Sequence, residues 1–221
     1  MTNLKNYKNQ DDDPLRRYVE KESGGPEYSP MDPPDTLEKV DLDEFAPCLK
    51  SLIQEHKEFT SKLEEFEKAI IHLKEHGLKK EDKVNQIING FFSYFDQEIL
   101  PHNFKEEKIL FPILNERLME KEEYNQAGGK RTAVDMMEDD HIKLIQLSTL
   151  TFNLFGLSVR LPDPKSHLIV LDLAIEQGLT LIELLRLHIY RENNIVFDLA
   201  QKHLTNEELN LIMEKFSKWA G

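Results

Sequence analysis

The 221-residue sequence carries 41 acidic and 28 basic residues, a formal charge of −13. This acidic balance gives no electrostatic basis for binding nucleic acid or an anionic membrane surface. The length allows one domain of ordinary size with an appendage, and Cys48, the single cysteine, excludes an internal disulfide or a site built from several thiolates. We expect a soluble, cytoplasmic monomer or weak dimer, because no secretory signal or membrane-spanning apolar run is evident.

The N-terminal segment has a different composition from the rest of the chain. Five of the ten prolines lie before residue 35, mixed with aspartates and glycines and with few large apolar residues. Such a segment cannot bury enough surface to offset the entropy lost on ordering. We therefore predict an irregular, flexible arm over residues 1–38 and a single helical domain over residues 39–221.

From residue 41 onward, apolar residues recur at three- and four-residue steps, which is typical of amphipathic helices. Four long helices are predicted over residues 43–76, 81–116, 132–157 and 164–203. A short fifth helix begins at Thr205, where Glu208 completes a capping box. Pro101 and Pro112 should bend the second helix or break it locally. With no strand signal between the helices, the sequence predicts an all-α fold, an antiparallel up-down four-helix bundle with a Pro-rich N-terminal arm and a short C-terminal helix.

Two blocks of the sequence repeat one pattern of residue types. They are HNFKEEKILFPIL at 102–114 and HIYRENNIVFDLA at 188–200. In each block a histidine stands four residues before a glutamate, which puts His102 with Glu106, and His188 with Glu192, one helical turn apart on the same face. Each pair can therefore reach one point.

A further histidine precedes each block at nearly the same distance. His56 stands before the first block and His141 before the second, and each follows an acidic residue. The chain is therefore interpreted as two helical hairpins of one design. Packed about a pseudo-twofold axis, the hairpins would turn four histidines and two glutamates toward a shared centre.

The residue types indicate a metal site with two ions. Imidazole suits Fe, Zn, Cu and Ni, carboxylates can bridge, and six ligands exceed what one tetrahedral ion requires. We assign His56 and His102 to one metal, His141 and His188 to the other, and Glu106 and Glu192 as bridges. Bridging carboxylates offset the repulsion between two cations and leave coordination positions for an oxo group, O2 or NO. Iron is favoured over zinc because the ligand count indicates five- or six-coordinate ions. The rival interpretation is a metal-free helical interaction module in which the histidines are incidental.

Two acidic residues beside the candidate ligands have two possible roles. Glu98 lies one turn before His102, and Asp140 lies next to His141. An unpartnered carboxylate is costly to bury. Each side chain therefore either reaches solvent at the flank of the bundle, or accepts a hydrogen bond behind the ligands and relays protons.

The paired blocks resemble the hemerythrin-like HHE cation-binding domain. The resemblance covers about residues 43–203, and its motifs are EH at 55–56, HNFKEEKILFP at 102–112, EDDH at 138–141 and HIYRENNIVF at 188–197. It implies a four-helix bundle with a carboxylate-bridged, non-haem di-iron centre. Oxygen-carrying hemerythrins add a fifth histidine one turn before the one on the third helix, and here Met137 occupies that position.

Within this family, the set of four histidines and two glutamates is most similar to the bacterial repair-of-iron-centres proteins. The resemblance implies iron sites that react with O2 or NO in oxidative or nitrosative stress, or in iron–sulfur cluster repair, with iron–sulfur proteins or electron donors as partners. It also implies functional roles for the acidic positions of Glu98 and Asp140. Many members carry a cysteine-containing N-terminal domain, which the cysteine-free arm here does not match. Reversible binding, storage or sensing of O2 or NO is the alternative.

Overall fold

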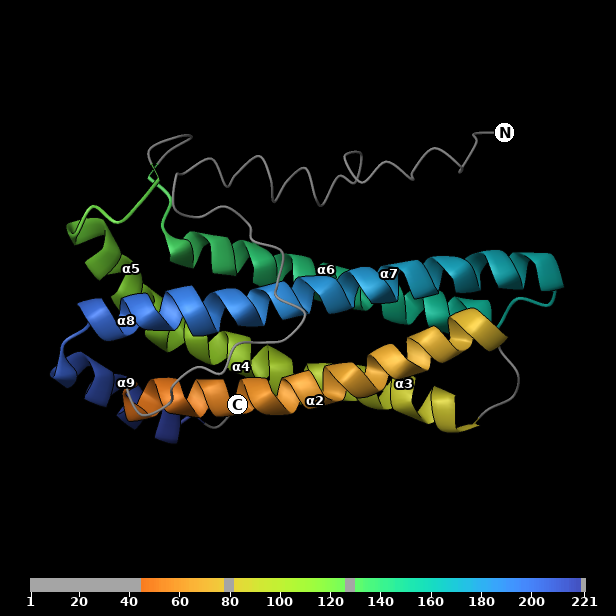
Figure 1. Ribbon diagram of the computed structural model, residues 1–221, viewed down its shortest axis with the longest axis horizontal. Helices are drawn as coiled ribbons and strands as arrows, with labels where there is room; N and C mark the ends of the chain where they lie inside the picture. The colour runs from red at the N-terminus through yellow and green to blue at the C-terminus, as the bar shows by residue number, and fades with distance from the viewer. Residues whose placement is uncertain (1–44, 78–81, 126–129, 220–221) are drawn as a thin grey trace.

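The computed structural model describes residues 45–77, 82–125 and 130–219, and these are almost entirely helical. The only strand-like feature among them is an isolated antiparallel bridge between Asn125 and Arg131. The arm predicted over residues 1–38 lies outside the described residues. The predicted all-helical character is confirmed, and Figure 1 shows long helical rods lying side by side.

The helices follow the predicted ranges to within a few residues. They are α2 (Pro47–His76); a second rod made of α3 (Asp82–Tyr94), η4 (Phe95–Ile99), α4 (Leu100–Lys105), η5 (Glu106–Leu110) and α5 (Phe111–Glu120); α6 (Ala133–Ser158); a fourth rod made of α7 (Pro164–Arg191), η6 (Glu192–Val196) and α8 (Phe197–His203); and α9 (Asn206–Ser217). The segments labelled η are single π-helical turns. The second rod ends at Glu120, later than predicted.

The prolines of the second rod do not break it. Pro101 follows η4, and Pro112 follows η5. A proline lacks the amide hydrogen, and its ring clashes with the carbonyl four residues earlier. The wider π turn directly before each proline changes that hydrogen-bond pattern while the chain remains helical. The predicted local distortion is therefore a π turn in each case.

A third π turn has no proline nearby. It begins at Glu192, and η5 begins at Glu106, the matching position of the first block. The repeat seen in the sequence therefore extends to backbone conformation. Single π turns inside α-helices occur frequently at functional sites.

Two helix starts carry side-chain caps, one of which is the capping box predicted at Thr205. At α9 the Glu208 amide donates to the Thr205 hydroxyl, and the Glu208 carboxylate accepts from the Thr205 amide. At α7 the Asp163 carboxylate accepts from the Ser166 amide. These bonds satisfy amides that lack partners inside the helix and so define where each helix begins.

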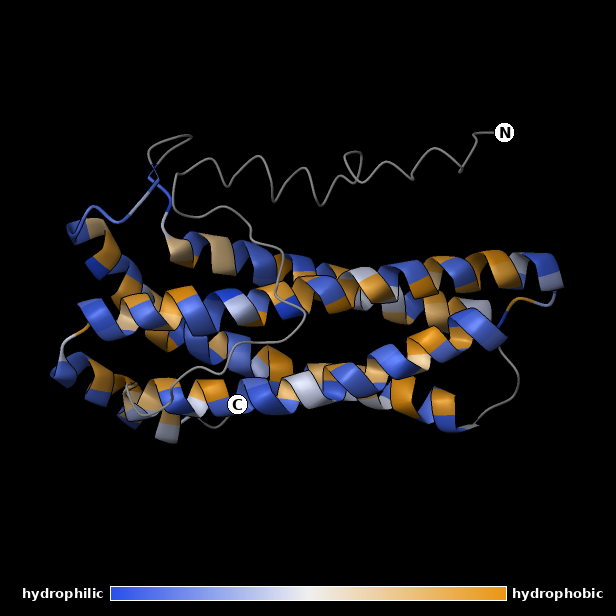
Figure 2. Ribbon diagram, in the orientation of Figure 1, coloured by the Kyte–Doolittle hydropathy of each residue, from blue (hydrophilic) through white to orange (hydrophobic). Residues whose placement is uncertain are grey.

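The buried apolar side chains form two clusters along the rods. The first includes Phe59, Leu63 and Phe66 of α2 with side chains from α3, α6 and α7. The second includes Leu49 and Leu52 of α2 with side chains from α5, α6, α8 and α9. Figure 2 shows apolar and polar residues alternating along each rod, as expected for amphipathic helices. The candidate ligands lie at the boundary between the two clusters along each rod.

Contacts between neighbouring helices hold the rods together side by side. Helix α6 packs against α7, α2 against both α3 and α7, and α9 against α2 and η5. Among the described residues, no helix combines the length and apolarity needed to cross a membrane.

The apolar cluster on the α3 side of the ligands can be tested with one deletion. Leu63 on α2 is 0% exposed, so Leu63→Ala should lower the free energy of unfolding by about 2–5 kcal/mol through lost burial and a residual cavity. The control is Ile71→Ala on the same helix, where 42% of the residue is exposed and the change should stay within about 0.5 kcal/mol. Urea denaturation measures both, and equal effects would contradict this description of the core.

Candidate metal centre

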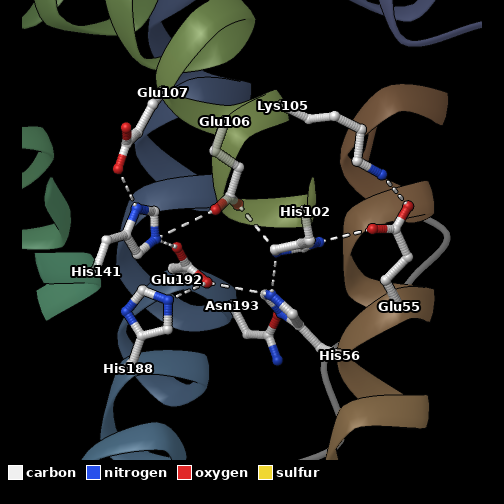
Figure 3. A network of polar contacts seen from close by, with 10 residues as sticks. All are labelled: Glu55, His56, His102, Lys105, Glu106, Glu107, His141, His188, Glu192 and Asn193. Atoms are coloured by element: carbon white, nitrogen blue, oxygen red, sulfur yellow. Dashed lines mark hydrogen bonds and ion pairs between the residues drawn. The ribbon is translucent and has the colours of Figure 1, made fainter. Parts of the chain in front are cut away.

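The six candidate ligands converge in the interior between the rods, as Figure 3 shows. They come from four separate rods, and each is at most 2% exposed: His56, His102, Glu106, His141, His188 and Glu192. Two groups of these side chains have ligand atoms within 4.8 Å of one another. One group is His56, His102, Glu106 and Glu192, and the other is His141, His188 and Glu192.

The first group is centred on two facing imidazoles. His56 Nε2 lies 3.0 Å from His102 Nε2. Glu192 Oε2 lies 3.1 Å from His56 Nε2, and Glu106 Oε1 lies 3.5 Å from His102 Nε2. Atoms that share one ion at about 2.0–2.2 Å stand roughly 3.0–3.5 Å from one another. The spacing therefore fits a shared cation.

The second group shares Glu192 with the first, and Glu106 also faces it. Glu192 Oε2 lies 3.3 Å from His188 Nε2. His141 Nε2 lies 3.6 Å both from Glu192 Oε1 and from Glu106 Oε2. Each carboxylate thus faces histidines of both pairs. This is the arrangement in which a glutamate can bridge two ions.

Five of the inward-facing ligand atoms lack hydrogen-bond partners among the described residues. Both carboxylate oxygens of Glu106 and of Glu192, together with His141 Nε2, are buried with no hydrogen bond to the described residues. Buried polar atoms in folded proteins are nearly always satisfied. Four carboxylate oxygens and an imidazole nitrogen aimed at one another are the donor set of a divalent cation site. The residues present fit a metal centre.

One carboxylate behind the site orients a ligand in the first hairpin. Glu55 Oε2 accepts a hydrogen bond from His102 Nδ1 at 2.7 Å, and Glu55 Oε1 accepts from Lys105 Nζ. A bond to the far ring nitrogen holds the imidazole in one tautomer and orientation, with Nε2 turned inward. Burial raises the pKa of Glu55, but the hydrogen bonds and charges of His102 and Lys105 outweigh burial, and the pKa lies below its ordinary range.

Two more hydrogen-bond acceptors each support a histidine of the other hairpin. Glu107 Oε1 accepts from His141 Nδ1 at 2.9 Å, and Asn193 Oδ1 accepts from His56 Nδ1 at 2.7 Å. Glu107 follows Glu106, and Asn193 follows Glu192, so the two bonds occupy matching places in the repeat. Sequence reasoning did not assign Glu55, Glu107 or Asn193 a role. Their positions next to candidate ligands were the available signals, since Glu55 directly precedes His56 and the other two residues directly follow the two glutamates.

The structure places Asp140 and Glu98 differently. Asp140 is 2% exposed, and its Oδ2 accepts from Arg191 Nη1 at 2.8 Å. Burial raises the pKa of Asp140, while Arg191 and Lys143 oppose that shift. Glu98 lies on η4 with its side chain exposed, which corresponds to the solvated alternative. Its negative charge instead helps raise the pKa of Tyr94 to about 12, an effect due first to burial of the phenol and next to Glu58.

Aromatic rings enclose the imidazoles. Phe197 stacks on His56 with ring centroids 5.6 Å apart, and Phe111 stacks on His141 at 5.8 Å. Both phenylalanines are 0% exposed, so they pack against the imidazoles inside the core. Met137, at the position of the fifth hemerythrin histidine, is buried in the cluster that contains Leu49 and Leu52.

Comparison with known proteins assigns the family. The model of the hemerythrin HHE cation-binding domain matches residues 48–200, which include all six candidate ligands. The chain belongs to the hemerythrin HHE cation-binding domain family. No curated protein and no solved structure matches it.

In this hemerythrin-family site, burial and the neighbouring charged side chains strongly shift the pKa values of the histidines. Burial lowers the pKa of His102, but Glu106 and Glu55 outweigh it and raise the pKa to about 9. Burial likewise lowers the pKa of His141, and Glu107 and Glu192 raise it to about 10. For His188 burial dominates and lowers the pKa to about 3. Without metal, protons on His102 and His141 thus offset the carboxylate charges.

These shifts predict how the stability of the metal-free hemerythrin domain depends on pH. His102 and His141 bind protons more tightly in the folded chain than at their ordinary pKa of 6.5. Their contribution is fully present below that value and is lost as pH rises through the folded pKa. The free energy of unfolding of the metal-free protein should therefore fall between pH about 6.5 and about 10, measured by urea denaturation.

The matched variant is Glu107→Gln, which removes the charged acceptor from His141 Nδ1. It should make the decline with pH shallower while His102 keeps its own share. A free energy of unfolding that rises or stays constant over this window would contradict the predicted protonation of the two histidines.

Proposed function

We propose that this domain is an antiparallel up-down four-helix bundle that holds two non-haem irons and reacts with O2 or NO. The observation that carries the proposal is the pair of fully buried glutamates, Glu106 and Glu192, each facing histidines of both pairs at 3.1–3.6 Å. His56 and His102 would hold one iron, His141 and His188 the other. When bound, the irons supply redox chemistry and open positions for a diatomic ligand.

A metal-free interaction module is the poorer account of these residues. Two carboxylates that are 0% exposed and lack hydrogen bonds among the described residues would each cost several kcal/mol of desolvation. An interaction module has no need to retain them. Two divalent cations would neutralise both carboxylates and satisfy the inward nitrogens at once.

The other side chains position the ligands and limit access by water. Glu55, Glu107 and Asn193 orient three imidazoles through Nδ1. Phe111 and Phe197 cover two of the rings. Imidazoles fixed in this way keep their positions when a small molecule binds, because neither the rings nor the backbone need to reorganise.

Met137 favours reactivity over oxygen carriage. A thioether at this buried position offers no imidazole to the His141 side of the site, so an iron there would keep fewer nitrogen ligands than in an oxygen carrier. We place the protein in the oxidative or nitrosative stress response or in iron–sulfur cluster repair in the cytoplasm, with iron–sulfur proteins or electron donors as partners. The acidic residues Glu98 and Asp140 stand at positions that match acids of the repair branch, which supports this placement. Reversible storage or sensing of O2 or NO is the alternative.

The metal content tests the proposal directly. Protein produced with ample iron should contain two irons per chain, and His102→Ala or His188→Ala should lose most of this iron because each removes one ligand of a pair. His76→Ala is the matched control, since His76 lies on the exposed end of α2 with 48% of its side chain accessible. Elemental analysis and circular dichroism on the same preparations separate metal loss from unfolding. One zinc per chain, or no metal, would refute the proposal.

The reaction with gases separates repair or reductive chemistry from carriage. The reduced, iron-loaded protein should be oxidised by O2 and should react with NO, and vacuum should not restore the reduced spectrum. Anaerobic titration followed by visible absorption measures this. An O2-dependent absorption that disappears under vacuum and returns with O2 would instead support a carrier or sensor.

A further inference from the structure

The bonds behind the ligands follow the same pseudo-twofold relation as the ligands. Asn193 supports His56, and Glu107 supports His141, from matching positions in the two blocks. The acid before each leading histidine also pairs with the basic residue before each bridging glutamate. Glu55 pairs with Lys105 in the first hairpin, and Asp140 pairs with Arg191 in the second.

The relation fails at one bond. Glu55 reaches both Lys105 and His102 Nδ1, one with each carboxylate oxygen. Its counterpart Asp140 bonds Arg191 through Oδ2 and makes no hydrogen bond to His188. His188 Nδ1 is buried and has no hydrogen-bond partner among the described residues. In Figure 3 no polar contact joins this nitrogen to any of the residues drawn.

Two sequence differences account for the missing bond. Asp140 is one methylene shorter than Glu55, so it cannot span the same distance from its helix. The second oxygen of Asp140 also faces Lys143 Nζ at 3.8 Å, whereas the matching position of the first hairpin is Glu58, an exposed acid. Asp140 is therefore held between two cations, and His188 Nδ1 is left without an acceptor.

The rings also differ in packing. Phe59, three residues after His56, contacts His102 edge-on with centroids 4.9 Å apart. The matching residue three positions after His141 is Leu144, which is buried but has no aromatic edge. His102 thus has a carboxylate on Nδ1 and a phenylalanine edge beside its ring. His188 has neither, and its aromatic neighbour is the other ligand His141, with centroids 4.8 Å apart.

We propose that the two metal positions are unequal, because Asp140 leaves His188 unsupported, and that the position of His141 and His188 is the exchangeable one. The inference rests on the proposed two-metal function. Loss of an acceptor behind a histidine ligand typically lowers metal affinity about 10–100-fold. The His56–His102 position should therefore fill first and empty last.

The order of filling can be observed at the individual histidines. Zn2+, a diamagnetic probe, is added to the metal-free, 15N-labelled full chain, and long-range 1H–15N spectra follow the ring nitrogens. One equivalent should shift Nε2 of His56 and His102, and the second should shift Nε2 of His141 and His188. Repulsion between cations weakens the second step whichever position fills first, so the identity of the first pair decides the question.

Two reciprocal variants test the role of the acid. Asp140→Glu should supply the missing bond and bring the exchangeable position to within a few-fold of the other in a chelator competition. Glu55→Asp should remove the bond to His102 and make His141 and His188 equal partners in the first step. Asp172→Glu, an exposed change on the same helix as His188, should leave the order unchanged.

The outcomes separate this inference from the proposed function. Equal shifts of all four histidines from the first addition, or earlier shifts of His141 and His188, would overturn the inference while leaving a two-metal site. An unchanged order in both Asp140→Glu and Glu55→Asp would exclude these acids as its cause. No shift at two equivalents would refute the metal site itself.

Discussion

The structure depends on keeping two carboxylates in a dry interior. Glu106 and Glu192 are 0% exposed and between them approach all four imidazoles, so their negative charges must be balanced locally. The cost of desolvation favours neutralisation of one carboxylate or a nearby cation. Burial and the neighbouring Glu192 raise the pKa of Glu106. The pKa of Glu192 is lowered, because His188, His141 and His56 together outweigh its burial. Protons perform this balance in the metal-free chain, and two divalent cations would perform it more completely.

The fold places this charged layer between two apolar clusters that supply the stability it cannot provide. The clusters lie on either side of the ligands along each rod, so the rods are anchored at both ends while their middle carries the polar layer. The π turns beginning at Glu106 and Glu192 lie within this layer. A π turn widens the helix at one point and changes which residues face inward after it. The distortion thus coincides with the two residues that bridge the hairpins.

Much of this arrangement could be predicted from local periodicity. Helix ranges follow from the apolar pattern, and the repeated His–Glu spacing indicates two ligand pairs because a helix returns to the same face every turn. The bonds behind the ligands could not be predicted that way. His56 and Asn193 are 137 positions apart, and His141 and Glu107 are 34 apart, so their contact depends on how each rod is rotated against its neighbours. Glu98 shows the same limit. Its position one turn before His102 did not decide between a solvent-exposed and a buried side chain, and part of the π turn η4 lies between the two residues.

The central claim is that two irons occupy this layer, one at each histidine pair. Diffraction from crystals of the iron-loaded protein, collected above and below the iron absorption edge, tests it most directly. The account predicts two iron peaks in the anomalous difference map, one beside His56 and His102 and one beside His141 and His188, with Glu106 and Glu192 between them. A single peak, or peaks away from these residues, would contradict it.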